Sequence, residues 1–369
     1  MNSSKHKRVL ILSPLPPPVG GIASWTVNVL EYIKRENFEN IFHLNTAILF
    51  RNITSNTPIV RIFSGLLDAF RIVTLFLFNV IKIRPNTVHL TTSASLGLFR
   101  DIIIAIFCKL FKIRLIVHFR FGRIPDLVKS ENWEWKLLVY LIRFSKNSIV
   151  IDQKSYEAIA LNHSNLPVVL LPNPCSLEVE KIAKKEVLKN KNQDFIYIGH
   201  VIEAKGVFDL ITAISNISEN IILRIVGPFD IQMKDQVIPL SKRKNNGDWL
   251  IFEGIKERSW ILQKMENSQC LILPSHTEGF PNVILEAMAC GCPVIASDVG
   301  AIPQMLDCLG EKPTGLCFPA KDILSLEKAM SNMMNNEKLK LVFSVNGKNK
   351  VLNEYRLEII FNKYRNLWN

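Results

Sequence analysis

Two glutamates eight residues apart, Glu278 and Glu286, are the strongest chemical signal in the sequence. The residues between them that would line a binding site are Gly279, Phe280, Pro281 and Asn282. A glycine lets a ligand approach the backbone closely, and the free N–H groups at a helix start attract an anion such as a diphosphate. Carboxylates beside such a site can accept hydrogen bonds from the paired hydroxyls of a sugar or a ribose. The simpler alternative is that Glu286 only complements the helix dipole and Glu278 is solvated.

A buried strand and a short helix must hold this turn in place. The apolar run at residues 269–274 predicts the strand, and residues 281–290 predict the helix. Asn282 is the predicted N-cap, and Gly291 is well placed as the residue just beyond the helix end. The turn then lies at the carboxyl end of a strand, which is where open α/β sheets bind ligands.

The same alternation of strand and helix runs through both halves of the chain. The predicted strands are residues 8–13, 87–92, 114–119 and 148–153, then 194–199, 221–227, 250–254, 269–274 and 292–297. Strand–helix–strand repetition predicts parallel sheets, and 369 residues exceed the roughly 250–300 at which one core stops growing. The fold class is therefore α/β, with two Rossmann-like doubly wound domains. A Pro-Asn-Pro break at 172–174 predicts domains at 1–175 and 176–350.

The excess of positive charge lies almost entirely in the first half. Residues 1–175 carry 21 of the 45 basic and 10 of the 33 acidic residues, a net +11 of the total +12. Such a field favours anionic lipid or an anionic substrate, and the absence of an aromatic-interleaved basic motif disfavours nucleic acid. The longest uncharged stretch within the apolar segment 59–83 is too short to span a bilayer. It predicts either a helix buried against the sheet or one that also contacts a membrane surface.

The order of motifs resembles family 4 of the retaining glycosyltransferases with the GT-B fold. The segment EGFPNVILEAMACGCPVIASDVG (278–300) is similar to the family's donor-site signature. Residues 14–30 resemble its opening glycine loop, 115–122 its central histidine strand, and 195–214 its Lys-Gly segment. The resemblance implies two domains facing a central cleft, with a last helix over 351–369 that packs back on the first domain. It also implies capsule, O-antigen or other surface-polysaccharide assembly.

The family's roles can be carried over by position. Gly20 and Gly21 would approach the donor diphosphate, and Lys205 would neutralise it as the nucleotide leaves. Glu286 would bind the ribose, and Glu278 the hydroxyls of the donor sugar. His118 would line the reaction centre, although a lone histidine at the end of an apolar strand is more often structural.

The sequence departs from the family pattern in three segments. The position of the family's arginine is best matched by His200, which lies five residues before Lys205. The corresponding contact with the diphosphate would therefore be weaker or dependent on pH. Ala301 and Gln304 stand in a stretch where the family has glycine and glutamate, which removes any charge role there. Pro174 stands where glycine is common.

Metal and disulfide chemistry are not expected. Cys290 and Cys292 flank Gly291 without a second cysteine or histidine pair at zinc spacing, so they are interpreted as packing residues. Seven cysteines without a CxxC pair predict a reduced, cytosolic protein. The family generally uses a lysine and a helix dipole in place of a metal, so no metal and no cofactor are predicted.

The sequence thus predicts an enzyme that transfers a sugar from a nucleotide-diphosphate sugar, UDP-hexose or UDP-N-acetylhexosamine, with retention of configuration. The predicted acceptor is a lipid-linked glycan at the inner face of the cytoplasmic membrane, where the protein would be peripheral. A soluble acceptor, or a GT-B nucleotide-sugar epimerase, is the alternative. A dinucleotide oxidoreductase is disfavoured because no GxGxxG follows the first strand of either half.

Overall fold

The computed structural model describes most of the chain, and the chain divides into two compact units. The described residues are 7–17, 20–49, 58–188, 192, 194–217, 221–229, 231–241 and 248–369, without the side chains of 58–63 and 231–234. The first unit contains residues 1–174 and 357–369, and the second contains residues 175–356. Each unit is described by itself.

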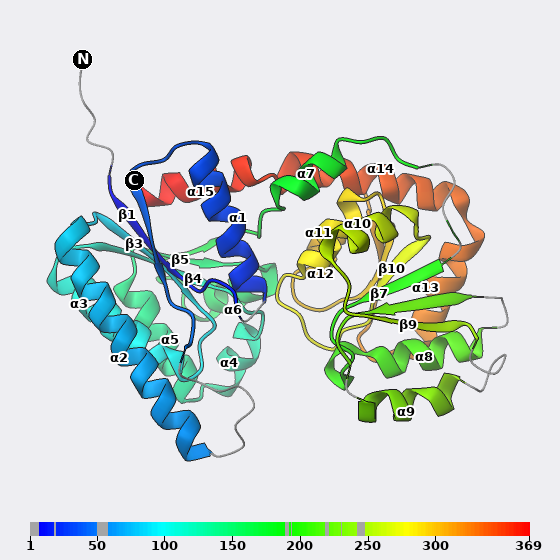
Figure 1. Cartoon of the computed structure of the whole chain (residues 1–369), viewed down its shortest axis with the longest axis horizontal. Coiled ribbons are helices and arrows are strands. Elements are labelled where there is room, and N and C mark those ends of the chain that lie inside the picture. The colour runs from blue at the N-terminus through cyan, green and yellow to red at the C-terminus, as the bar shows by residue number, and fades with distance from the viewer. Residues whose placement is uncertain are drawn as a thin grey trace. The chain divides into compact units, whose positions relative to one another are not determined.

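A six-stranded parallel sheet forms the centre of the first unit (Figure 1). Its strands are β1 (Val9–Ser13), β2 (Ile41–Asn45), β3 (Thr87–Thr92), β4 (Arg114–Phe119), β5 (Asn147–Val150) and β6 (Val168–Leu170). Their order is β2-β1-β3-β4-β5-β6, so the order reverses between β1 and β3. The chain runs from β1 outward to β2, then returns to the other side of β1. Such a reversal opens a crevice at the carboxyl ends of the two strands.

Helices cover both faces of this sheet. They are α1 (Gly21–Arg35), α2 (Pro58–Ile83), α3 (Gly97–Leu110), α4 (Ile124–Ser130), α5 (Trp133–Phe144), α6 (Gln153–Asn162) and α15 (Leu357–Trp368). Figure 1 shows α1 and α15 on one side of the strands and α2, α3 and α5 on the other. Alternate strand residues such as Leu10 and Leu12 pack with Ile72 and Phe76 of α2 in one apolar core.

The second unit is built around a second parallel sheet of six strands. They are β7 (Asp194–Ile198), β8 (Ile222–Val226), β9 (Leu250–Gly254), β10 (Cys270–Leu273), β11 (Val294–Ser297) and β12 (Gly315–Phe318). The order is β12-β11-β10-β7-β8-β9, so this sheet reverses between β7 and β10. The prediction of parallel sheets in both halves is confirmed.

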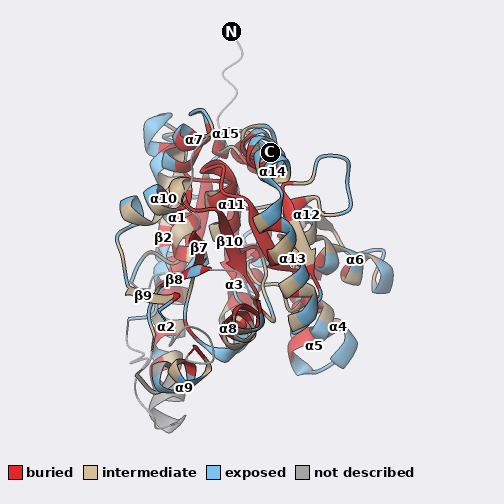
Figure 2. Cartoon of the chain, turned by 90° about the vertical axis from the view of Figure 1, so that its right-hand side faces the viewer, coloured by how far each residue is buried: buried red, intermediate tan, exposed pale blue. Residues whose placement is uncertain are grey.

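The helices of the second unit also lie on both faces of its sheet. They are α7 (Leu177–Ala183), the 3-10 turn η1 (Glu203–Lys205), α8 (Val207–Asn216), α9 (Ile231–Ser241), α10 (Arg258–Asn267), α11 (Asn282–Ala289), α12 (Ile302–Leu306), α13 (Ile323–Asn335) and α14 (Glu337–Glu354). Buried residues follow the strands, and exposed residues follow the outward sides of the helices (Figure 2). Phe195, Ile225 and Ile272 pack with α8 and α13 in the core of this unit.

The N-cap of the helix that follows the candidate site lies one residue earlier than the sequence predicts. Pro281 is the N-cap residue and Asn282 is already helical, so the prediction of an Asn282 cap is wrong. A proline suits this place because its fixed φ is compatible with a helix start and it has no N–H to satisfy. At the other end the prediction for Gly291 is confirmed: its φ is +63°, and the N–H groups of Gly291 and Cys292 donate to Met288 and Ala287.

The carboxyl-terminal segment divides into two helices rather than one. The sequence predicts a single helix over 351–369, but α14 continues to Glu354 and α15 begins at Leu357. Tyr355 lies between them, and its carbonyl accepts a hydrogen bond from the N–H of Cys175 at 2.8 Å. The chain therefore leaves the second unit beside the residue where it entered.

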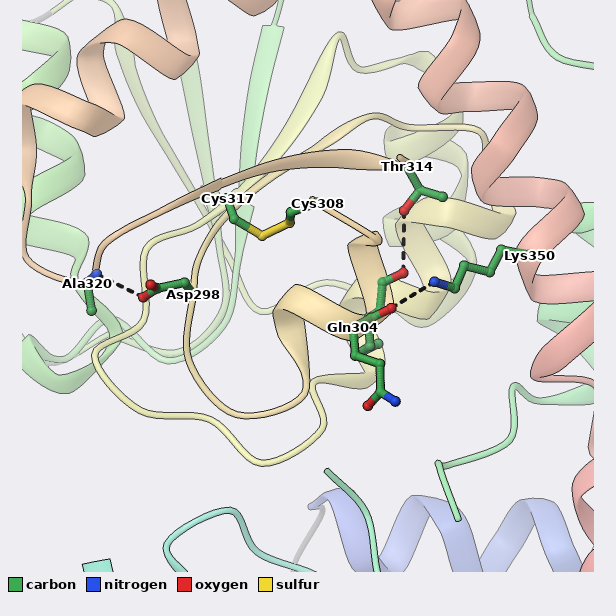
Figure 3. The surroundings of a disulfide bond; sticks show 8 residues. Asp298, Gln304, Cys308, Thr314, Cys317, Ala320 and Lys350 are labelled. Carbon is green, nitrogen blue, oxygen red and sulfur yellow. Dashed lines mark hydrogen bonds between the residues drawn. A yellow bond between two sulfur atoms is a disulfide. The ribbon is translucent and has the colours of Figure 1, made fainter. Parts of the chain in front are cut away.

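The structure corrects the prediction that all cysteines are reduced. Cys308 forms a disulfide with Cys317, with the two Cα atoms 6.0 Å apart (Figure 3). Cys308 follows α12 and Cys317 lies in β12, and the N–H of Thr314 donates to the carbonyl of Leu306 at 2.8 Å. This turn brings the two sulfur atoms together, although their spacing of nine residues matches no cysteine motif.

Candidate functional site

Lys205 and Glu278 meet at the point where the second sheet reverses. Lys205 is in η1, on the segment after β7, and Glu278 is on the segment after β10. Lys205 Nζ lies 2.6 Å from Glu278 Oε1, and Ser275 Oγ donates to the same oxygen at 2.7 Å. The lysine side chain is 29% exposed and the glutamate 13%. The pair is therefore accessible to a ligand. It is also partly buried, so that its charges interact more strongly than they would in bulk water.

Close backbone contact holds the two segments together. Gly206 has a φ of +66° and lies against Pro274, so that a Cβ at this position would overlap the Pro274 carbonyl oxygen. The N–H of His276 donates to the carbonyl of Ala204 at 3.0 Å, and His276 Nε2 lies 2.7 Å from Asp209 Oδ2. The lysine and the glutamate are therefore placed by backbone contacts rather than by their own ion pair.

A second glycine supports the turn from the other side. Gly300 has a φ of +55°, and a Cβ there would overlap the carbonyl oxygens of Glu278 and Gly279. The N–H of Ala301 donates to the carbonyl of Gly279 at 2.8 Å. Ala301 thus supports the turn through its backbone. Gln304 accepts a hydrogen bond from Lys350 Nζ through its backbone carbonyl at 2.7 Å (Figure 3).

Glu286 projects from α11 and is paired with an arginine that the sequence interpretation missed. Arg258 Nη1 lies 2.8 Å from Glu286 Oε1, and Arg258 Nε lies 2.9 Å from Glu178 Oε2. Burial raises the pKa of the Glu286 carboxyl, and the Arg258 guanidinium offsets only part of that shift. Glu286 is thus a partly buried carboxylate with a cationic partner, which is more than a side chain that complements a helix dipole.

His200 and Phe280, which the sequence also predicts as site residues, belong to the second unit as well. His200 is exposed on the segment after β7, and its backbone carbonyl accepts a hydrogen bond from the Tyr197 hydroxyl at 2.7 Å. Phe280 is 9% exposed, and its ring centroid lies 5.9 Å from that of Tyr355. Phe280 therefore anchors the start of α11 to the end of α14.

In the first unit, Gly20 and Gly21 begin α1 on the segment after β1. Gly20 is the N-cap residue with extended backbone, and the first turn contains no acidic side chain. Added Cβ atoms at either glycine would meet nothing within 4 Å. The two glycines therefore leave open space above the start of the helix.

His118 ends up fully buried near the carboxyl end of β4. Its Nδ1 lies 3.2 Å from His89 Nε2, and its Nε2 lies 3.3 Å from Arg120 Nη1. Burial and the nearby Arg120 charge lower the pKa of His118 well below its usual value and that of His89 to about 3. His118 is thus a neutral imidazole inside the unit.

Arg120 is another residue that the sequence interpretation missed. Its guanidinium lies over the Trp25 ring, 4.9 Å from the centroid, and Nη1 donates to Asn173 Oδ1 at 2.6 Å. Burial lowers its pKa to about 10, so the group keeps its positive charge at neutral pH. A partly buried arginine supported by an amide and a ring suits an anionic or oxygen-rich ligand.

The described residues contain no group of three or more His, Cys, Asp or Glu side chains that could hold a metal ion. Cys290 Sγ lies 3.4 Å from the Leu262 carbonyl and Cys292 Sγ 3.9 Å from that of Ser268, both in the interior. These two thiols pack against backbone rather than face each other across a ligand.

A family match and solved structures agree with this geometry. Residues 178–350, which make up most of the second unit, match the family described as "Glycosyl transferases group 1". Over 98% of both chains, the fold resembles sucrose-phosphate synthase from Thermosynechococcus elongatus, with a TM-score of 0.73 and 17% identity. Anabaena HepE, solved in complex with UDP, covers 98% of this chain and 99% of its own, with a TM-score of 0.72 and 15% identity. The architecture is therefore that of the GT-B glycosyltransferases.

Curated relatives match about half of the chain. The capsular polysaccharide biosynthesis glycosyltransferase CapM of Staphylococcus aureus is 28% identical over 199 residues, which are 52% of this chain and 50% of the relative. An N,N'-diacetylbacillosaminyl-diphospho-undecaprenol alpha-1,3-N-acetylgalactosaminyltransferase of Campylobacter jejuni is 34% identical over 115 residues, 30% of this chain and 28% of the relative. The chain thus spans about half or less of the length of these relatives.

Proposed function

We propose that this protein is a retaining glycosyltransferase of family 4 that uses a UDP-sugar, hexose or N-acetylhexosamine, as donor. The observation that carries the proposal is the Lys205–Glu278 pair at the reversal of the second sheet, inside the domain that the family model matches. A lysine there can neutralise a departing diphosphate, and a carboxylate beside it can accept hydrogen bonds from sugar hydroxyls. Anabaena HepE was solved with UDP-glucose, which supports the choice of base.

The proposed mechanism needs no metal and no covalent nucleophile. Lys205 stabilises the charge that develops on the leaving diphosphate, which a divalent ion does in other transferases. The acceptor hydroxyl attacks from the face that the diphosphate leaves, and the leaving phosphate takes the proton of that hydroxyl. Glu278 orients the sugar and Glu286 the ribose.

A panel of nucleotide sugars tests the donor. The productive donor should raise the melting temperature of the protein and be slowly hydrolysed.

Glu286→Gln should raise the KM for this donor by about tenfold or more, because the substitution removes charge-assisted hydrogen bonds to the ribose. The pKa of Glu286 is raised, so wild-type KM should rise as pH falls through it, whereas the glutamine variant should not respond. The control is Glu178→Gln, since Glu178 binds the same Arg258. Equal effects of both variants would show that Glu286 acts only through Arg258.

We propose further that the acceptor is a lipid-linked glycan, with the protein on the inner face of the cytoplasmic membrane. The Campylobacter jejuni relative is named for a diphospho-undecaprenol acceptor, which supports this choice over a soluble acceptor. An epimerase would convert the nucleotide sugar without any acceptor, so product analysis with and without acceptor separates the two. Among the described residues, no helix is long and apolar enough to cross a membrane.

An exposed apolar face in the first unit supports membrane contact. The α2–α3 face consists of exposed side chains on two helices that pack together: Leu66, Phe70, Phe78, Ile81, Phe99 and Leu110. The opposite side of α2 is buried, with Ile72, Phe76 and Val80 in the core. Exposed basic side chains lie in the last turns of the two helices or just after them: Lys82, Arg84, Lys109 and Lys112. An apolar face with basic neighbours suits the surface of an anionic bilayer.

The protein should bind vesicles that contain anionic lipid, and the binding should weaken as salt rises, since screening shortens to about 3 Å at 1 M. Replacing Phe70 and Phe78 by serine should lower the vesicle partition coefficient by about tenfold or more per residue. The reason is that each exposed phenylalanine ring of the wild-type protein would move from water into the bilayer on binding. Leu161→Ser is the matched control, since Leu161 is 85% exposed on α6 of the same unit. Equal binding to neutral and anionic vesicles would remove the electrostatic part of the proposal.

A further inference from the structure

A pocket at the amino ends of β3, β4 and β5 is lined by basic side chains and by no acidic one. It has a volume of about 700 Å³ and belongs to the first unit alone, where the last turns of α3 and α5 also contribute to it. Its basic residues are Lys7, Lys109, Lys112, Arg114, Arg143 and Lys146. Open α/β sheets bind substrates at the carboxyl ends of their strands. The pocket therefore lies at the opposite edge of the sheet from His118 and is separate from the candidate site.

The positive charge around this pocket has no carboxylate partner. In the part of the chain that the structure describes, none of the six basic side chains forms an ion pair with an aspartate or glutamate. Arg114 and Lys7 donate to the backbone oxygens of the last two residues. Elsewhere in the same unit a cation is paired, as where Arg100 Nη2 lies 2.6 Å from Asp101 Oδ1. The uncompensated charge is thus a local property of the pocket.

Helix ends explain only part of this charge. Lys109 and Arg143 lie in the last turns of α3 and α5, where the helix dipole favours a cation. Lys112, Arg114 and Lys146 lie beyond those turns, and the effect of the dipole falls off within the last turn. Like charges around one pocket repel each other, and an anion bound among them would replace that repulsion by attraction.

The side chains and the size of the pocket favour an organic phosphate. Arginine binds phosphate oxygens through paired N–H groups, and lysine binds them as a point charge. Small-molecule sites have volumes of roughly 300–1,000 Å³, so the pocket has room for a phosphate and the group that carries it. Leu110 and Phe111 at the end of α3 are 68% and 50% exposed, between Lys109 and Lys112 in the sequence. Apolar contacts are therefore available beside the basic residues.

We propose that this pocket is a phosphate site distinct from the donor site, and that the ligand it fits is the headgroup of an anionic phospholipid. The choice of a lipid over a soluble organic phosphate rests on the proposed function, in which the α2–α3 face, with Leu110, meets the membrane. The phosphate site itself is independent of glycosyl transfer, because none of the proposed donor residues lines the pocket.

Calorimetric binding of monomeric dihexanoyl phosphatidylglycerol, compared with glycerol phosphate, tests the site. The double variant Arg143→Gln with Lys146→Gln should bind the lipid about tenfold or more weakly than the wild-type protein, because it loses two charge-assisted hydrogen bonds. Both side chains are exposed, so the variant should remain folded. Lys112→Gln, in the segment after α3, should weaken binding in the same direction. The matched control is Lys129→Gln with Lys136→Gln, which removes the same charge from exposed positions of the first unit outside the pocket.

The two probes distinguish the sources of the phosphate. Tighter binding of the lipid than of glycerol phosphate would support a phospholipid headgroup, whereas equal affinities would support the phosphate site and overturn the choice of a lipid. Binding of neither probe, or equal losses in the pocket variant and the control variant, would overturn the whole inference. So would binding that Lys205→Ala abolishes, since the probe would then occupy the donor site. The measurements need no nucleotide sugar and no vesicle, so a failure of the proposed function would leave their result intact.

Discussion

Replacing Lys205 by alanine is expected to lower kcat by about 10²-fold or more, with a smaller change in donor KM. The lysine contributes most when charge develops on the departing diphosphate, because that charge exists only in the transition state. Loss of one preorganised electrostatic group in other enzymes costs a similar factor. Steady-state transfer assays, with donor concentration varied at saturating acceptor, separate kcat from KM.

A lysine with a comparable ion pair provides the control for this experiment. Lys184 lies 2.7 Å from Glu180 at the end of α7. Lys184→Ala should leave kcat within about twofold, since the lysine side chain is 58% exposed and lies outside the segments that carry Lys205 and Glu278. Glu278 loses its cation in Lys205→Ala but keeps the Ser275 hydrogen bond, so the turn should remain folded. If Lys205→Ala left kcat intact while Glu286→Gln abolished turnover at unchanged donor affinity, the assigned roles would be wrong, even with the family right.

The buried strands and the donor-site turn could be predicted because their signals are local. The predicted strands 87–92 and 269–274 contain mostly apolar or β-branched residues, and the structure has buried strands at Thr87–Thr92 and Cys270–Leu273. The backbone just after α11 has a positive φ, which favours glycine, and Gly291 is visible in the sequence at that place. Such features depend on residues within a few positions of one another.

Three of the four edge strands of the described sheets, β2, β6 and β12, were not predicted, whereas the fourth, β9, was. β2 is partly exposed, β6 is only three residues long and β12 only four, so each gives a weak signal in the sequence. Their pairing is decided by the neighbouring strand rather than by their own side chains. The same reason applies to the disulfide, which depends on how α12 and β12 are brought together.

Partners of the site residues could not be predicted because they come from distant elements. Arg258 reaches Glu286 from α10, and Trp368 reaches His89 across 279 positions. The residues next to an arginine or a tryptophan in the sequence do not indicate which distant side chain it will contact. Position at the carboxyl end of a strand drew attention to His118, but its contacts with His89 and Arg120 depend on the fold around it.

The second large effect is expected from Gly206→Ala, on both stability and catalysis. The φ of +66° costs an alanine about 1–2 kcal/mol, and overlap of its Cβ with the Pro274 carbonyl adds about 1–3 kcal/mol. The free energy of unfolding should therefore fall by about 2–5 kcal/mol, measured from urea transitions. Since relief of the overlap must separate η1 from the end of β10, Lys205 should move away from Glu278 and kcat should fall as well.

Gly254→Ala separates the two contributions. Gly254 has a φ of +72°, but an added Cβ would meet nothing within 4 Å, so this variant bears only the conformational cost of about 1–2 kcal/mol. It should leave kcat unchanged, because Gly254 ends β9 at the far side of the sheet from β10. Equal loss of stability in the two variants would mean that the segments after β7 and β10 can separate at no cost. The Lys205–Glu278 pair would then depend on its own ion pair rather than on the backbone contact beneath it.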